Sequence, residues 1–180
     1  SVSDLVKFSG VDAVYVCVPP MGHGEAERAC ARKGMPMFIE KPLSNTLKTA
    51  GELKALVKKS GVLCSVGYHW RYSDLSLRGR AFLMGKTVQL ALGSWLGGMP
   101  GARWWRTKSQ CGGQHVEQTT HIFDLARFYL GEVKRVHAVS ASLGRSSTKD
   151  YDVEDASVVN LEFKSGAVAN ISSTTLLDDM

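Results

Sequence analysis

The sequence predicts an α/β fold with a parallel sheet, followed by an α+β domain with a mainly antiparallel, open sheet. Three observations lead to this prediction. The apolar run VDAVYVCV at residues 11–18 is typical of a strand that is buried on both faces of a parallel sheet. Between residues 11 and 68, strand and helix patterns alternate, as they do in βαβ units. After residue 130, strand patterns follow one another directly, which favours an antiparallel sheet.

The first part of the chain contains alternating strand and helix patterns. We expect strands at residues 11–18, 35–40 and 62–68, and helices at residues 25–33 and 46–60. Gly34 and Gly61 directly follow the two helices, and glycine is a common residue at helix ends. These elements form two consecutive βαβ units and therefore predict a parallel sheet.

The pattern changes near Tyr68, where a second domain begins. We expect helices at residues 74–84 and 116–130, a loosely alternating strand at 87–97, a loop at 99–111, and strands at 133–142, 156–163 and 167–176. The stretch KSGA at residues 164–167 predicts a hairpin turn between the last two strands. The predicted domains are therefore residues 1–70 and 71–180.

Composition and charge restrict the class of protein. The 180 residues are 44% hydrophobic and 22% charged, as in ordinary soluble globular proteins. We expect no membrane span, since no apolar window is long enough, and residues 1–10 do not resemble a signal peptide. The net charge of +5 comes from scattered lysines and arginines, so we expect a solvated basic surface and no nucleic-acid partner.

The cysteines indicate the cellular compartment. Cys17, Cys30, Cys64 and Cys111 lie far apart and form no Cys-x-x-Cys pair. Cys17 and Cys64 fall within apolar runs that are typical of strands. We therefore expect buried free thiols, no zinc or other metal site, and a reducing, cytoplasmic location.

Lys41 lies in the stretch FIEKPLSNT, at the carboxyl end of a predicted parallel strand. Open α/β sheets bind ligands at this edge. Pro42 restricts the backbone of Lys41 to an extended conformation, which directs the side chain. A lysine that is partly desolvated in a cleft can act as an acid or a base. The alternative is a surface lysine in a loop, and position alone favours that alternative.

Glu117 and His121 are four residues apart in a predicted helix, so we expect them on one face, about one turn apart. Asp124 and Arg127 lie close to the same face. Histidine is the usual general acid–base near neutral pH, and a carboxylate one turn away can orient its ring. A metal site would need a second group of ligands, and no His-Glu-x-x-His pattern is present. A simple surface pair remains an equal alternative.

Two further stretches contain candidate binding residues. PPMGHGE at residues 19–25 is a glycine-containing turn from a strand into a helix, but it is not Gly-x-Gly-x-x-Gly. His23 in this turn follows a predicted strand, as Lys41 does, so it would either face the same cleft as Lys41 or be an ordinary turn histidine, and the two alternatives are equal. ARWWRTKSQ at residues 102–110 contains two tryptophans and several cations, which would either contact a polar substrate or seal a domain interface.

The stretches CVPPMGH, FIEKPLS, SVGYHWRY and GG…VEQ..HIFDLARFYLGEV, in this order, resemble the glucose–fructose oxidoreductase and inositol dehydrogenase family (Gfo/Idh/MocA). The resemblance implies an NAD(P)-dependent oxidoreductase that acts on a sugar, a polyol or a related hydroxy or keto compound. It also implies a Rossmann domain and a second α/β domain whose open sheet often mediates oligomerisation.

The resemblance assigns roles to individual residues. Lys41 matches the active-site lysine, and the family pattern admits a cis bond between Lys41 and Pro42. His121 matches the histidine that exchanges the substrate proton, and Glu117 falls where many members have aspartate. The implied cofactor-binding residues are Pro19, His23, Glu40 and Lys41. The implied substrate-binding residues are Trp105, Arg106, His69 and Arg71.

One departure from the family pattern changes the functional prediction. Residues 11–18 correspond to the fourth strand of a Rossmann sheet, so the first three strands and the glycine-rich cofactor cradle are not in this chain, and the second domain ends early. We therefore expect weak or no binding of NAD or NADP. Because the first strand of the sheet is missing, an apolar strand edge is exposed, and we expect a dimer or higher homo-oligomer. The alternative function is a non-catalytic remnant that acts as a binding or oligomerisation module.

Overall fold

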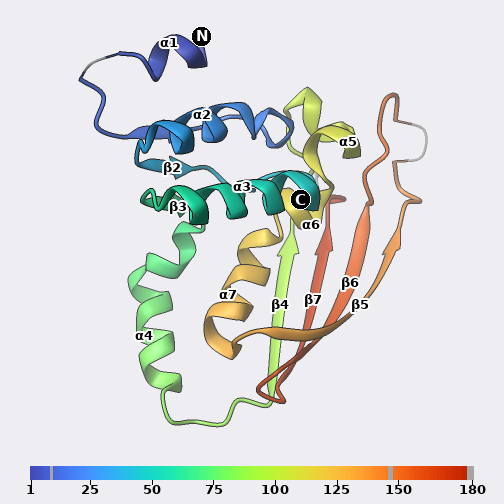
Figure 1. The fold of residues 1–180 in the computed structure, drawn as a ribbon. Helices are drawn as coiled ribbons and strands as arrows, with labels where there is room; N and C mark the ends of the chain where they lie inside the picture. The colour runs from blue at the N-terminus through green and yellow to red at the C-terminus, as the bar shows by residue number, and fades with distance from the viewer. Residues whose placement is uncertain (9, 146–147, 178–180) are drawn as a thin grey trace. The chain divides into compact units, whose positions relative to one another are not determined.

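The computed structural model describes residues 1–8, 10–145 and 148–177. The chain forms two compact units (Figure 1). Unit 1 comprises residues 1–67 and 109–112, and unit 2 comprises residues 68–108 and 113–180. Residues 109–112 thus group with unit 1, although the sequence-based division assigned them to the second domain. In the described part of the chain, no helix combines the length and apolar character that a membrane span requires.

Unit 1 contains a three-stranded parallel sheet in the order β1-β2-β3. The elements are α1 (Val2–Leu5), β1 (Val14–Val16), η1 (Pro20–Gly22), α2 (Glu25–Lys33), β2 (Met37–Ile39), α3 (Leu47–Ser60) and β3 (Cys64–Val66). Tyr15, Phe38 and Ser65 lie side by side across the sheet. The predicted parallel sheet is confirmed, although each strand is shorter than the apolar run that predicted it.

Local signals explain where the two long helices of unit 1 begin and end. The side chain of Thr46 accepts a hydrogen bond from the amide of Thr49 at 3.2 Å and caps the start of α3. Helices α2 and α3 end at Gly34 and Gly61, which have φ angles of 69° and 67°. Glycine adopts this left-handed conformation without strain. Both predicted helices are confirmed.

The helices α2 and α3 cover one face of the sheet in unit 1. Their apolar side chains pack on Val14 and Val16 of β1 and on the matching residues of β2. Tyr15 points to the other face and is 75% exposed, and Cys17 is also exposed. The prediction that residues 11–18 are buried on both faces is therefore wrong, as is the prediction that Cys17 is buried. The physical reason is that no described element of unit 1 packs on that side.

Unit 2 contains a four-stranded sheet in the order β4-β7-β6-β5. Its elements are η2 (His69–Tyr72), α4 (Asp74–Leu83), β4 (Leu90–Leu96), η3 (Arg103–Arg106), α6 (Gln114–Glu117), α7 (Thr120–Leu130), β5 (Val133–Ala141), β6 (Ala156–Phe163) and β7 (Val168–Thr174). Helix α5 (Lys108–Cys111) lies between η3 and α6 in the chain. β5, β6 and β7 pair antiparallel and β4 pairs parallel with β7, which confirms the mainly antiparallel sheet.

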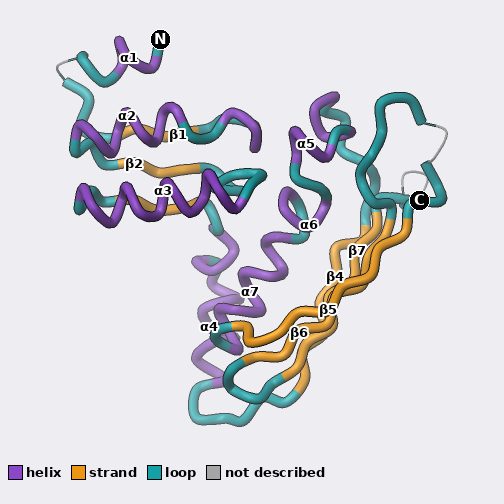
Figure 2. Tube along the Cα trace, turned by 45° about the vertical axis from the view of Figure 1, so that its right-hand side comes forward, coloured by secondary structure: helices purple, strands orange, loops and turns teal. Residues whose placement is uncertain are grey.

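Helix α7 packs on one face of this sheet and leaves the opposite face open (Figure 2). The buried face includes Leu161, Phe163 and Ile171, which contact apolar residues of α7. The hairpin predicted at residues 164–167 is confirmed, because the amide of Gly166 donates to the carbonyl of Phe163 at 3.0 Å.

Two sequence predictions in unit 2 are wrong in detail. The predicted loop at 99–111 contains η3 and α5, because the fully buried Trp105 anchors this segment. The predicted helix at 116–130 is interrupted at Gln118, where the amides of Gln118 and Thr119 both bond to the carbonyl of Gln114 at 2.9 Å. The Gln114 side chain is itself buried and donates to a β7 carbonyl, so a tertiary contact sets this break.

Candidate functional site

Lys41 lies two positions after the end of β2 and is half-buried in unit 1. Its amide donates to the Glu40 carboxylate at 3.0 Å, and its bond to Pro42 is cis. The Glu40 carboxylate lies over the backbone of Gly67, where an added Cβ would come within 3.2 Å of both oxygens. The lysine therefore sits at the carboxyl end of the parallel sheet, beside a carboxylate that neighbouring backbone holds in place.

His23 precedes α2 and forms a buried pair with Glu27. Its Nδ1 lies 2.5 Å from one Glu27 oxygen, and the other oxygen accepts from the amide of Gly24 at 2.6 Å. Burial raises the pKa of Glu27, but the bonds from His23 and Gly24 outweigh burial and hold the pKa below its ordinary value. The Pro19 carbonyl accepts from Gly22 at 2.7 Å and closes the turn before this pair.

The start of α2 does not fit the pyrophosphate of a dinucleotide. A phosphate group binds to open amides at a helix N-terminus. Here Glu27 already occupies the amide of Gly24 and adds a negative charge, and Glu25 lies in the same first turn. The described residues therefore provide a lysine and a carboxylate at the carboxyl edge of the sheet, but they do not provide a phosphate cradle in this turn.

His121 is the second residue of α7 in unit 2 and is 5% exposed. The ring of Trp70 stacks on its imidazole, with the two ring centroids 4.9 Å apart. His69, which is exposed at the surface, approaches the same imidazole edge-on at 5.1 Å. The imidazole of His121 is therefore in contact with two other rings, those of Trp70 and His69. Among the described residues, no group of three or more potential metal ligands occurs.

Glu117 and His121 belong to two successive helices, whereas the sequence predicts one continuous helix. Glu117 ends α6, whereas His121 belongs to α7, and the break at Gln118 separates them. The Glu117 carboxylate accepts a hydrogen bond from Nε1 of Trp105 at 2.9 Å. Trp105 is fully buried, so its indole fixes the carboxylate from within unit 2.

Arg71 binds Asp124 with two hydrogen bonds, from Nε at 2.5 Å and from Nη2 at 2.6 Å. This fork matches the geometry of a carboxylate. The bond to Asp124 raises the pKa of Arg71 above its ordinary value. Arg106, the other arginine that the resemblance assigned to substrate, is half-buried, and its carbonyl accepts from the amide of Asp152 at 3.1 Å.

Sequence reasoning did not identify Trp70 and Trp95, both of which stack near His121. Trp70 lies in the stretch SVGYHWRY, but no spacing or alternation in that stretch marks it as a residue near His121. Trp95 occupies an inward position in the alternation of β4, which a strict count of every second residue would have found. Sequence reasoning also missed the buried chain of hydrogen bonds from His115 through Ser157 to Ser173.

Two family models match most of the chain. Residues 1–68 match a model described as an oxidoreductase family with an NAD-binding Rossmann fold. Residues 85–179 match a model described as the GFO/IDH/MocA C-terminal domain. The two matches cover both the parallel and the mixed sheet.

Individual relatives agree with these models. The chain is 28% identical over 176 residues to scyllo-inositol 2-dehydrogenase (NAD(+)) of Bacillus subtilis, covering 95% of this chain and 51% of the relative. It is 31% identical over 176 residues to myo-inositol 2-dehydrogenase of Thermotoga maritima, covering 95% of this chain and 52% of the relative. The chain thus spans about half the length of these curated relatives.

A solved structure of levoglucosan dehydrogenase in complex with NADH and L-sorbose has the same fold. The TM-score is 0.89 at 21% identity, and the match covers 97% of this chain and 50% of that protein. With two family models covering residues 1–68 and 85–179, this chain belongs to the GFO/IDH/MocA family of oxidoreductases.

Proposed function

We propose that this chain is part of an NAD(P)-dependent oxidoreductase that acts on a hydroxyl or keto group of a sugar, a polyol or a related compound. Family membership supports the reaction type, and the names of the inositol dehydrogenases support the substrate class. The observation that carries the proposal is that Lys41 and His121 each have a defined environment within their own unit. These are the two residues that the resemblance marks for proton transfer.

In the proposed reaction, Lys41 and His121 handle the hydroxyl proton of the substrate. Oxidation of a secondary alcohol removes this proton together with a hydride, for which a bound nicotinamide would be the acceptor. A general acid–base near neutral pH suits the proton step. Glu117 adds a negative charge whose position Trp105 fixes.

We propose separate roles for the remaining candidates. His69 and Arg106 are proposed to contact the substrate. Trp105 and Arg71 are proposed to act on substrate binding indirectly, because the polar group of Trp105 already binds Glu117 and that of Arg71 already binds Asp124.

The cofactor proposal is NAD or NADP, with Pro19, His23, Glu40 and Lys41 at its reactive end. The name of the Bacillus subtilis relative supports NAD. We expect weak binding by this chain, since the turn before α2 is capped by Glu27 and does not fit a pyrophosphate.

An assay of the 180-residue chain tests the function. The protein is titrated with NADH and NADPH by calorimetry and then mixed with NAD⁺ or NADP⁺ and a panel of inositols and sugars, while reduced nicotinamide is followed by absorbance. Turnover that is lost in Lys41→Ala, and retained when the exposed Lys33 is changed to alanine, supports the oxidoreductase. Absence of both binding and turnover favours the non-catalytic binding or oligomerisation module.

We also propose that the open face of the sheet in unit 2 binds a second copy of the chain. The exposed apolar residues on this face of the sheet include Leu90, Leu92, Leu96, Val139, Val158 and Val168. Several exposed apolar side chains on one face, set among polar ones, are typical of an interface.

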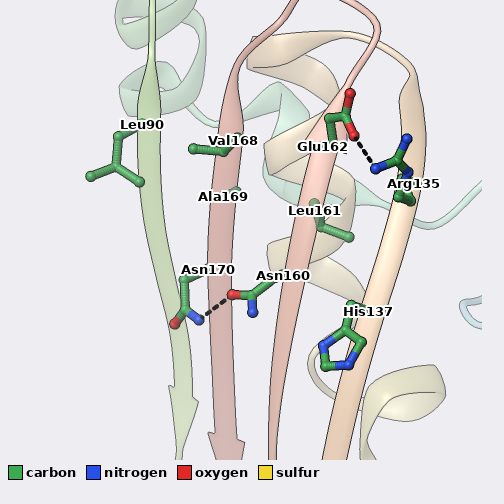
Figure 3. Close-up of a pocket in the computed structure, with 9 residues that line it drawn as sticks. All are labelled: Leu90, Arg135, His137, Asn160, Leu161, Glu162, Val168, Ala169 and Asn170. Carbon is green, nitrogen blue, oxygen red and sulfur yellow. Dashed lines mark hydrogen bonds and ion pairs between the residues drawn. The ribbon is translucent and has the colours of Figure 1, made fainter.

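The residues labelled in Figure 3 line a depression on this face, which has a volume of about 370 Å³. Within it Asn170 donates to Asn160 at 2.8 Å, and Arg135 pairs with Glu162 at 3.4 Å. Light scattering of the wild type and of Leu92→Lys tests the proposal. A dimer that dissociates in the variant supports it, and a monomeric wild type contradicts it.

A cytoplasmic location remains a proposal. Cys17, Cys30 and Cys64 are free thiols, which suits a reducing compartment.

A further inference from the structure

The imidazole of His121 lies within a cluster of four other aromatic rings of unit 2. Trp70 is nearly parallel to it, at a centroid distance of 4.9 Å and an angle of 14°. Trp95 is nearly parallel to both, 5.6 Å from Trp70 and 6.2 Å from His121. His69 and Tyr68 approach the imidazole edge-on, at 5.1 and 6.4 Å. The imidazole thus has two nearly parallel rings and two roughly perpendicular rings around it.

The fold brings these rings together through a close approach of α7 to β4. A Cβ added at Gly93 would come within 2.5 Å of Cγ2 of Ile122, so the missing side chain admits α7 at this point. Trp95 is the next inward residue of β4 after Gly93, and His121 is the neighbour of Ile122. The approach of the two backbones therefore sets the distance between Trp95 and His121.

A second contact connects η2 with α7. Arg71, which follows Trp70 in the chain, binds Asp124, which lies about one helical turn after His121. The carboxylate of Asp124 is 7% exposed, so this ion pair is largely shielded from water. Arg71 is adjacent to Trp70, and Asp124 lies one turn from His121. The ion pair therefore holds the rings of Trp70 and His121 in register.

A histidine that exchanges a proton must present one ring nitrogen in a constant direction. The terminal torsion of a histidine side chain is broad, so the backbone alone does not set this direction. A stacked aromatic pair favours one ring orientation roughly twofold to tenfold. We propose that Trp70 is a positioning residue, whose indole face fixes the imidazole plane of His121 for proton transfer. The kinetic part of this inference rests on the proposed oxidoreductase function.

Proton NMR tests the ring geometry without any assay of activity. A proton over an indole face resonates upfield, so we expect the ring protons of His121 to lie upfield of those of an exposed histidine. The chain has five histidines, and the variant His121→Asn assigns the signal. In Trp70→Leu the signal returns towards the position of a free histidine. In the control Phe82→Leu, which removes an exposed ring of α4, it stays in place.

Steady-state kinetics test the positioning role. We expect Trp70→Leu to lower kcat about twofold to tenfold, because the preference for one ring orientation that the aromatic pair supplies is lost, while KM changes less than about twofold. Trp70→Phe keeps a flat ring and is expected to recover most of the loss. Circular dichroism reports whether Trp70→Leu folds. If it does not fold, Trp70→Phe still tests the positioning role.

The two readouts distinguish failure of this inference from failure of the proposed function. A wild-type His121 signal with no upfield shift, or a signal that Trp70→Leu leaves unchanged, overturns the inference whatever the activity. Equal kcat values in the wild type and in a folded Trp70→Leu variant also overturn the positioning role. A wild type that shows the shift but neither binds NADH or NADPH nor turns over substrate counts against the proposed function and leaves the ring geometry supported.

Discussion

The indole Nε1 of the fully buried Trp105 donates a hydrogen bond to the carboxylate of Glu117 at 2.9 Å. Phenylalanine at position 105 would keep an aromatic ring but would lose the donor and leave a gap. We expect Trp105→Phe to lower the free energy of unfolding by about 2 kcal/mol. Urea denaturation measures this loss.

Two controls separate the hydrogen bond between Trp105 and Glu117 from the effect of a smaller ring in η3 and from the effect of the charge on Glu117. Trp104→Phe makes the same change at the half-buried neighbouring residue of η3, and we expect a smaller loss of stability. Glu117→Gln keeps a carbonyl acceptor for the indole and removes the charge. If Trp105→Phe is as stable as the wild type, the bond to Glu117 contributes nothing to the fold.

The bidentate pair of Arg71 and Asp124 has a partly buried arginine and a largely buried carboxylate. Arg71→Leu leaves that carboxylate without its guanidinium, so we expect a loss of about 2 kcal/mol in the free energy of unfolding. The exposed pair of Arg127 and Glu132 is the matched control, and Arg127→Leu is expected to cost less than about 1 kcal/mol. Equal effects of the two substitutions in thermal denaturation would contradict the importance of burial.

The lack of a side chain at Gly93 is required for the packing of α7 on β4. In Gly93→Ala the new methyl group overlaps Ile122, and we expect a destabilisation of about 2 kcal/mol. Gly51→Ala is the control, since nothing lies within 4 Å of its added Cβ and the residue is inside α3. That substitution is expected to stabilise by about 0.5–1 kcal/mol. A destabilised Gly51→Ala, or a Gly93→Ala as stable as the wild type, would refute this view of the two positions.

His115 makes the stability of the fold dependent on pH. Burial lowers its pKa below the ordinary value of 6.5, with opposing effects from Glu154 and Lys108. The unfolded chain therefore binds a proton more readily than the folded one. The stability contributed by neutral His115 is present above pH 6.5 and is lost as the pH falls through the lower pKa of the folded state.

Denaturation at a series of pH values below 7 measures this loss. His115→Gln is expected to flatten the dependence on pH, whereas His137→Gln, at an exposed position on β5, is expected to leave it unchanged. A slope that persists in His115→Gln would assign the effect to other groups. Glu27 has an ordinary pKa of 4.5 that is lowered in the fold, so its contribution is lost only at more acid pH.

Several elements were predictable because their signals are local. Thr46, Gly34 and Gly61 mark helix ends through bonds and backbone angles within one turn, and the structure has those ends. The exposure of Tyr15 was not predictable from its apolar run, because it depends on which faces of the sheet other elements cover. The break at Gln118 likewise depends on a distant partner.

The residues themselves were therefore sufficient for the order of strands and helices, for the directed backbone at Lys41 and Pro42, and for the family. Long-range contacts set the rest of the candidate site. Arg71 and Asp124, which bind each other, are 53 positions apart in the chain. Local periodicity describes neighbours within a turn or a strand, and it contains no information about which distant side chains meet. The surroundings of His121 and Glu117 arise only when packing brings such distant segments together.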